Sequence, residues 1–133
     1  MSEKVCVITG GTSGIGKCTA EAMREKGYAV YELSRRAQGL EGFYHIPTDV
    51  TKPEMVDAAI AEVLQKEDHI DVLINNAGFG VSGAVEFTEP EAAKKQFDVN
   101  FFGMVNVCHA VLPVMRRDCR GRIVYLSSVA GVV

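Results

Sequence analysis

Short apolar runs alternate with longer amphipathic segments along the chain. Five runs have the length of strands, at 5–8, 28–33, 42–46, 70–74 and 122–126, and the first is apolar throughout. Apolar residues recur at helical spacing in 14–26, 53–66 and 89–117, with an interruption expected near Asn100. Strands that alternate with helices form right-handed βαβ units. The pattern predicts an α/β fold built on a doubly wound parallel sheet.

Composition and net charge restrict the class of protein and its partners. The chain has 133 residues, of which 47% are hydrophobic and 23% charged, enough to form one core without disulfides. A net charge of -3 argues against a nucleic-acid partner or an anionic membrane surface. No signal-peptide pattern begins the chain, and no apolar run approaches the roughly 20 residues of a membrane span. We therefore expect a soluble, cytoplasmic protein with a single domain over residues 1–133.

The cysteines and histidines are scattered rather than clustered. No pair of cysteines has the Cys-x-x-Cys spacing of a metal or redox site, and all four fall within or next to predicted strands or helices. We expect buried, reduced thiols and no metal site. The residues concerned are Cys6, Cys18, Cys108, Cys119, His45, His69 and His109.

A glycine-rich segment, Thr9–Gly16, lies between the first predicted strand and the first predicted helix. Backbone N–H groups at such a turn, together with the positive end of the helix dipole, hold phosphate groups. Glycine suits the turn because a side chain would keep the phosphate away from the backbone, and because the turn visits positive φ. The segment predicts a nucleotide site at this end of the sheet.

Two nucleotide-binding patterns compete for this segment. Gly11–Lys17 matches the G-x-x-x-x-G-K phosphate-binding loop of nucleotide triphosphatases, but Cys18 follows where that pattern requires Ser or Thr for Mg²⁺. A thiol is a poor ligand for so hard a cation. The segment also matches T-G-x-x-x-G-x-G, which we favour, and the P-loop NTPase is the weaker alternative.

Five motifs in one order resemble those of the short-chain dehydrogenase/reductase family, over nearly the whole chain. They are Thr9–Gly16, Asp49-Val50, Asn75–Gly78, Asn100 within Asp98–Gly103, and Ser128 within Leu126–Gly131. The resemblance implies a Rossmann-like sheet of strand order 3-2-1-4-5. It also implies an oxidoreductase that transfers hydride between a nicotinamide dinucleotide and a small alcohol or carbonyl substrate.

The resemblance further implies roles for single residues. Ser128 corresponds to the catalytic serine that orients the substrate oxygen, and Asn100 to the catalytic asparagine that supports a proton relay. Family members commonly form dimers or tetramers, so we expect a homo-oligomer. The implied cofactor-binding residues are Gly10, Thr12, Ser13, Gly14, Ile15, Gly16, Ser34, Arg35, Asp49, Val50, Asn76, Ala77 and Gly78.

Several of these residues also have a local explanation. Asn76 can satisfy backbone groups at the end of a strand and so brace the crevice, and Ser128 can form a turn. Asp49 can cap the helix that begins at Pro53. Asn100 lies in an apolar helical stretch, where asparagine opens the local hydrogen-bond ladder unless it faces solvent.

The preference for NAD or NADP depends on residues near the end of the second strand, here Glu32–Arg36. An acid there binds the NAD ribose, whereas a base accepts the 2′-phosphate of NADP. Glu32 falls within the strand, and Ser34 stands where NAD-preferring members of the family have Asp. The guanidinium of Arg35 suits a phosphate because it forms bidentate, charge-assisted hydrogen bonds. We therefore favour NADP(H), with NAD(H) as the alternative.

The family's proton donor, a Tyr-x-x-x-Lys pair, is not among the 133 residues. The residues four positions after Tyr28, Tyr31, Tyr44 and Tyr125 are Glu32, Arg35, Thr48 and Val129. We expect the N-terminal portion of a reductase, without the last strands of the family's sheet and inactive by itself. The alternative from another class is a non-catalytic dinucleotide-binding or sensor protein of the same fold.

Overall fold

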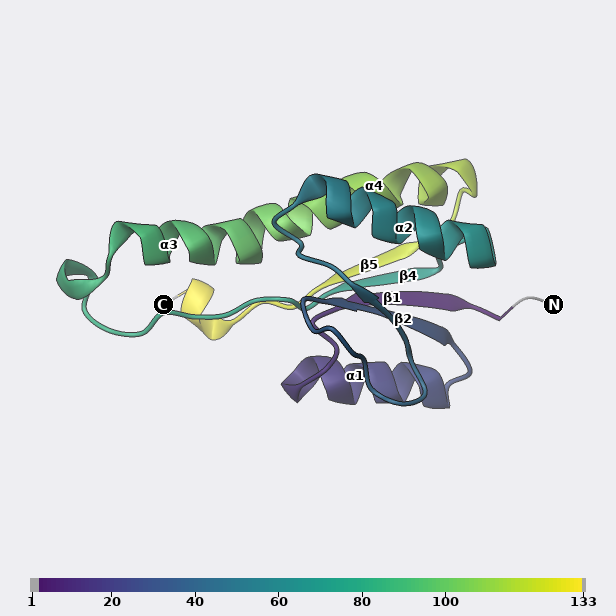
Figure 1. Ribbon diagram of the computed structural model, residues 1–133, viewed down its shortest axis with the longest axis horizontal. Helices are drawn as coiled ribbons and strands as arrows, with labels where there is room; N and C mark the ends of the chain where they lie inside the picture. Colours follow the sequence, from purple (N-terminus) through teal and green to yellow (C-terminus); the bar gives the residue numbers. More distant parts are fainter. Residues whose placement is uncertain (1–2, 133) are drawn as a thin grey trace.

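A computed structural model describes residues 3–132 of the chain. Five parallel strands form one sheet in the order β3-β2-β1-β4-β5 (Figure 1). The predicted strand order is therefore confirmed. The strands are β1 (Val5–Thr9), β2 (Ala29–Ser34), β3 (Tyr44–Pro47), β4 (Val72–Asn75) and β5 (Arg122–Tyr125).

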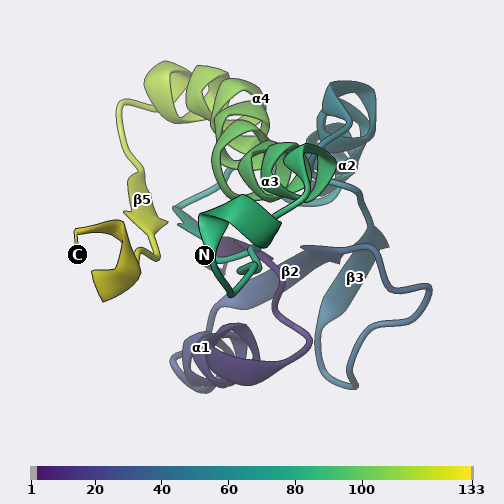
Figure 2. The same cartoon turned by 90° about the vertical axis from the view of Figure 1, so that its left-hand side faces the viewer.

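Helices cover both faces of the sheet. Figure 2 shows α1 (Gly14–Glu25) against one face, and α2 (Pro53–Glu67) with α4 (Met104–Arg117) against the other. The helix α3 (Pro90–Phe97) leads into α4 through a π-helical turn, η2 (Asp98–Gly103), which contains Asn100. The predicted interruption of the long helix is thus present, as one extra-wide turn. Two short 3₁₀ helices, η1 (Val85–Phe87) and η3 (Val129–Gly131), complete the elements.

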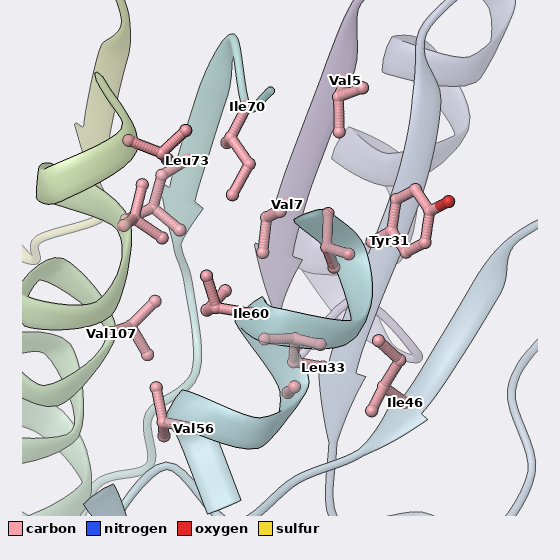
Figure 3. Packing of buried hydrophobic residues seen from close by; sticks show 14 of the residues in the cluster. Val5, Val7, Tyr31, Leu33, Ile46, Val56, Ile60, Ile70, Leu73 and Val107 are labelled. Carbon is pink, nitrogen blue, oxygen red and sulfur yellow. The ribbon is translucent and has the colours of Figure 1, made fainter. Parts of the chain in front are cut away.

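The larger part of the core lies between the sheet and the pair α2 and α4. Val7 and Leu73 project from the central strands toward Ile60 and Val107 of these helices (Figure 3). A smaller cluster on the opposite face joins β1, β2 and β4 to Ala20 of α1. Because β1 is buried on both faces, its end can hold a site rigidly at the edge of the sheet.

The strand β5 forms one edge of the sheet, and its burial differs from that of the central strands. Val124 and Tyr125 are exposed, and Ile123 is only partly buried. β1, in contrast, is buried from Val5 to Thr9. In residues 3–132, β5 therefore presents apolar side chains to solvent.

The expectation of four buried thiols is wrong for two of them. Cys6 and Cys108 are buried, but Cys18 and Cys119 are exposed. Cys18 lies on the outer face of α1, and Cys119 follows α4 in a left-handed turn with φ 52°. No cysteine in the described part of the chain forms a disulfide.

We expect the exposed and buried thiols to react at different rates. Burial raises the pKa of Cys6 to about 12, and only the thiolate is a good nucleophile. A thiol reagent at mildly alkaline pH should therefore label Cys18 and Cys119 in the native protein, and Cys6 only after denaturation. Mass spectrometry of the labelled protein measures this, with a Cys18→Ser/Cys119→Ser variant as the control. Fast native labelling of Cys6 would contradict the packing of β1.

The expectation that no segment is suited to cross a membrane is also corrected. The helical stretch Pro90–Arg117 has 28 residues and, by length and composition alone, is long and apolar enough to cross a membrane. One such helix is weak evidence, since a helix that packs in a core meets the same requirement. Here Val107, Val111 and Val114 of α4 belong to the core cluster.

Candidate functional site: a cleft at the carboxyl ends of the strands

A cleft of about 490 Å³ opens where β1, β2 and β4 end. Parallel α/β sheets place ligands at this edge, where the connections on the two sides diverge. Every predicted cofactor-binding residue except Gly14 lines the cleft. The walls are completed by Leu33, Arg36, Thr48, Phe79 and Val99, which the sequence reasoning did not identify.

The glycine-rich turn forms the floor of the cleft between β1 and α1. Gly10 and Gly14 have φ values of 66° and 55°, which other residues rarely adopt. A Cβ atom on Gly16 would collide with the Asn76 side chain and the Gly10 carbonyl, whereas one on Gly14 would meet no atom within 4 Å. The backbone at the start of α1 therefore packs closely on one side and is open on the other, which suits a phosphate group.

Two side chains from neighbouring strands hold this turn. The Asn76 amide Nδ2 donates to the carbonyls of Thr9 and Gly10, at 3.0 and 2.9 Å. The hydroxyl of Thr9 accepts from the backbone N–H groups of Asn76 and Ala77, both at 3.0 Å. Asn75 points away and donates to the Cys108 sulfur at 3.5 Å. Of the two asparagines, Asn76 is thus the one that braces the crevice.

The positive side of the cleft lies after β2. Arg35 and Arg36 both line it, beside Ser34. The Ser34 hydroxyl is buried and has no hydrogen-bond partner within residues 3–132. Two guanidinium groups at the end of the second strand are the arrangement expected for an anionic group on the ligand.

Asp49 lines the same cleft as these arginines and forms a local turn. Its Oδ1 accepts from the N–H of Thr51 at 3.0 Å and from the Thr51 hydroxyl at 2.7 Å. Burial by itself would raise the pKa of Asp49, but these hydrogen bonds and the charges of Lys52 and Arg35 outweigh it, so the pKa is lowered. Asp49 is therefore a carboxylate acceptor at the cleft as well as part of a turn.

Asn100 fixes the loop that forms the cleft's outer rim. Its Oδ1 accepts from the Phe79 N–H at 3.0 Å, and its Nδ2 donates to the Phe79 carbonyl at 2.7 Å. Gly78 packs directly against the same side chain, because a Cβ there would lie 3.0 Å from Oδ1. The π-helical turn η2 thus presents Asn100 to the loop after β4.

Removal of this side chain should loosen the loop. In an Asn100→Ala variant, amide exchange at Phe79 should become faster because its acceptor is lost. Thr51 is the internal control, since its N–H donates to Asp49 Oδ1 at 3.0 Å, outside the rim loop, and should keep its rate. Hydrogen exchange followed by NMR measures the Phe79 and Thr51 amides, and an unchanged Phe79 rate would show that Asn100 does not hold the loop.

Ser128 lies beyond the end of β5, and its hydroxyl accepts from the N–H of Ala130 at 3.1 Å. It caps the 3₁₀ helix η3 and is exposed. Neither Ser128 nor Asn100 is among the residues that line the cleft. The structure therefore brings the cofactor-binding candidates together and leaves the two catalytic candidates on elements beside the cleft.

The other nucleotide-binding pattern finds less support in the geometry. Lys17 and Cys18, which end the P-loop match, are exposed on α1 and do not line the cleft. The cleft fits a ligand held by backbone N–H groups and arginines.

Sheet order, glycine turn and cleft together define a Rossmann-like nucleotide-binding protein. A family model described as short chain dehydrogenase matches residues 4–133. The chain belongs to this short-chain dehydrogenase/reductase family of oxidoreductases.

Curated relatives and solved structures agree with this assignment. The chain is 41% identical over 134 residues to a protein named 3-ketodihydrosphingosine reductase of Bacteroides thetaiotaomicron, covering 100% of this chain and 50% of the relative. It is 35% identical to a short-chain dehydrogenase from Streptomyces avermitilis, with a TM-score of 0.94, covering 100% of this chain and 52% of that structure. A structure named ElxO with NADP bound has 29% identity and a TM-score of 0.92, covering 98% and 58%. The chain spans about half the length of these relatives.

Proposed function

We propose that the chain forms the cofactor-binding part of an NADP(H)-dependent oxidoreductase that acts on an alcohol or carbonyl substrate. The observation that carries the proposal is the pair Arg35 and Arg36 at the end of β2, beside the unpartnered hydroxyl of Ser34. These groups suit a 2′-phosphate, whereas an acid at this place would repel it. The NADP-bound ElxO structure, which shares the fold, supports the same choice.

Different residues of the cleft bind different parts of the dinucleotide. Backbone N–H groups of Ser13 to Gly16 hold the pyrophosphate, and Arg35 with Ser34 holds the 2′-phosphate. Asp49 and Val50 contact the adenine, and Asn76 to Gly78 support the rest of the nucleotide at the end of β4. The bound nicotinamide supplies hydride transfer, which is the chemistry of the cofactor.

The two remaining candidates act next to the cleft. The Ser128 hydroxyl orients the substrate oxygen once it leaves its bond with Ala130, and Asn100 keeps the rim loop and the relay in place. Residues 1–133 contain no Tyr-x-x-x-Lys pair to pass the proton. We therefore propose that these residues alone bind the nucleotide without turning over substrate.

Ligand-dependent thermal unfolding tests the proposal. A ligand that binds only the folded state raises the melting temperature in proportion to the logarithm of its concentration over Kd. NADPH should raise it more than NADH does, and ATP with Mg²⁺ should leave it unchanged. Stabilisation by ATP with Mg²⁺ instead would favour the P-loop alternative, and equal effects of NADPH and NADH would overturn the NADP preference.

Turnover separates the reductase from the sensor alternative. Consumption of NADPH with carbonyl substrates is measured for residues 1–133 and for any longer protein that contains them. 3-Ketodihydrosphingosine belongs in the panel because the Bacteroides relative is named for its reduction. Activity that depends on Ser128 in the longer protein supports the enzyme. Tight NADPH binding without turnover there would identify a sensor, and turnover by residues 1–133 would refute their inactivity.

A further inference from the structure

A carboxylic acid and an imidazole lie side by side on the neighbouring strands β2 and β3. Glu32 is in the middle of β2 and only 2% exposed. Its neighbour in register on β3 is His45. A buried acid is costly unless its oxygens find partners, so this pair needs a reason beyond packing.

The pair joins two segments that are distant in sequence. Glu32 Oε1 accepts from the N–H of Gly11 in the glycine turn, at 3.1 Å. Glu32 Oε2 pairs with His45 Nδ1, and His45 Nε2 donates to the carbonyl of Arg36 at 2.7 Å. The imidazole also fills the space beside Gly39, because a Cβ there would collide with it. A continuous chain of hydrogen bonds thus runs from the phosphate-binding turn to the arginine segment.

The hydrogen-bond partners determine how many protons the pair carries. Nε2 faces a carbonyl, which only accepts, so Nε2 bears a hydrogen. Nδ1 faces a carboxyl oxygen, so one more hydrogen lies between these two atoms. Whether that hydrogen belongs to the imidazole or to the acid, the pair has no net charge. An acid can therefore contact the glycine turn without adding a net negative charge next to it.

We propose that Glu32 and His45 are positioning residues that set the selectivity of the cleft for a dinucleotide with a 2′-phosphate. The pair fixes the backbone of Arg36, and with it the adjacent Arg35, at a set distance from the glycine turn. A ligand with both a pyrophosphate and a 2′-phosphate uses both segments, whereas one without the 2′-phosphate uses only the turn. This inference rests on the proposed function.

The test compares the Kd values of NADPH and NADH by titration calorimetry. His45→Ala breaks the link to Arg36 and should weaken NADPH binding by about tenfold, the equivalent of one charge-assisted hydrogen bond. NADH binding should change much less. Glu32→Gln should bind NADPH as the wild type does, because its amide can accept from Gly11 and donate to a neutral His45, which still donates to Arg36.

His69 provides the matched control for a purely structural effect. It is a buried histidine at the opposite end of the sheet, with its ring nitrogens on the backbone carbonyls of Glu67 and Glu3, and its Nε2 also lies 3.2 Å from Asp71 Oδ2. His69→Ala should lower the melting temperature and leave the ratio of the two Kd values unchanged. If His45→Ala does not fold, the double variant Glu32→Gln/His45→Phe keeps the ring volume and the Gly11 contact, and should show the same loss of selectivity.

The possible results separate this inference from the proposed function. A wild-type protein that does not prefer NADPH overturns the proposed function. A wild-type protein that prefers NADPH, with a His45 variant that loses affinity for both nucleotides equally, overturns the positioning pair alone. A Glu32→Gln variant that binds NADPH as weakly as His45→Ala does would also overturn the positioning pair. A neutral hydrogen-bond chain would then not be enough to hold the Arg36 backbone.

Discussion

An Arg35→Asp variant is expected to bind NADPH about thirtyfold more weakly, while its Kd for NADH stays close to that of the wild type. The lost interaction is a charge-assisted hydrogen bond to the 2′-phosphate, worth about 2 kcal/mol. The new carboxylate would also face that phosphate. Fluorescence titration of the bound nicotinamide measures both constants.

The same substitution should also raise the pKa of Asp49. The positive charge of Arg35 is one of the causes that lower the pKa of Asp49. A carboxylate in its place adds a like charge, so the pKa of Asp49 should rise, which carbon-detected NMR can follow. Arg116→Asp is the matched control, since it makes the same charge change on an exposed site in the last turn of α4. Equal weakening of NADPH and NADH by Arg35→Asp would remove the basis for a 2′-phosphate site.

Gly16→Ala should destabilise the protein by about 3 kcal/mol and abolish nucleotide binding. The added Cβ collides with the Asn76 side chain and the Gly10 carbonyl. An overpacked site costs about 1–3 kcal/mol, and each hydrogen bond of Asn76 that breaks costs about 1 kcal/mol more. Urea unfolding measures the loss of stability, and calorimetry the loss of binding.

Gly80→Ala is the control for this change. A Cβ on Gly80 would meet no atom within 4 Å, and its φ is not in the left-handed region. Its effect on stability should stay within about 0.5 kcal/mol, as for most exposed sites. A Gly16→Ala variant as stable as Gly80→Ala, with nucleotide binding intact, would show that close packing at Gly16 does not shape the turn.

Local pattern predicts the elements and the glycine turn, and the family resemblance adds the strand order and most of the residues that line the cleft. The apolar run at Val5 and the glycines that follow it predict a buried strand and a phosphate-binding turn, because both depend on residues near in sequence. The interruption at Asn100 was predicted for the same reason. The exposure of Cys18 and Cys119 was not predicted. Strand or helix periodicity does not show which side chains remain uncovered when the elements pack together.

Some residues of the site could not be identified from the sequence, for a common physical reason. In the sequence alone, Glu32 is one residue of a strand pattern and Thr9 the first residue of a motif. Their partners, Gly11, His45, Asn76 and Ala77, come from other elements, and only strand register places them within hydrogen-bond distance. Arg36 was likewise passed over in favour of Arg35, although both line the cleft.

The sequence by itself determined the order of strands and helices, the glycine turn and the candidates for cofactor binding. The order of elements and the glycine turn follow from hydrophobic periodicity and backbone freedom, which act over a few residues, whereas most of the cofactor-binding candidates follow from the resemblance to the family. The tertiary structure decided which side chains hold the turn, how Asn100 fixes the rim loop at Phe79, and that a buried acid has an imidazole beside it. Each of these is a contact between segments far apart in the chain, which forms only when the sheet brings the strands side by side.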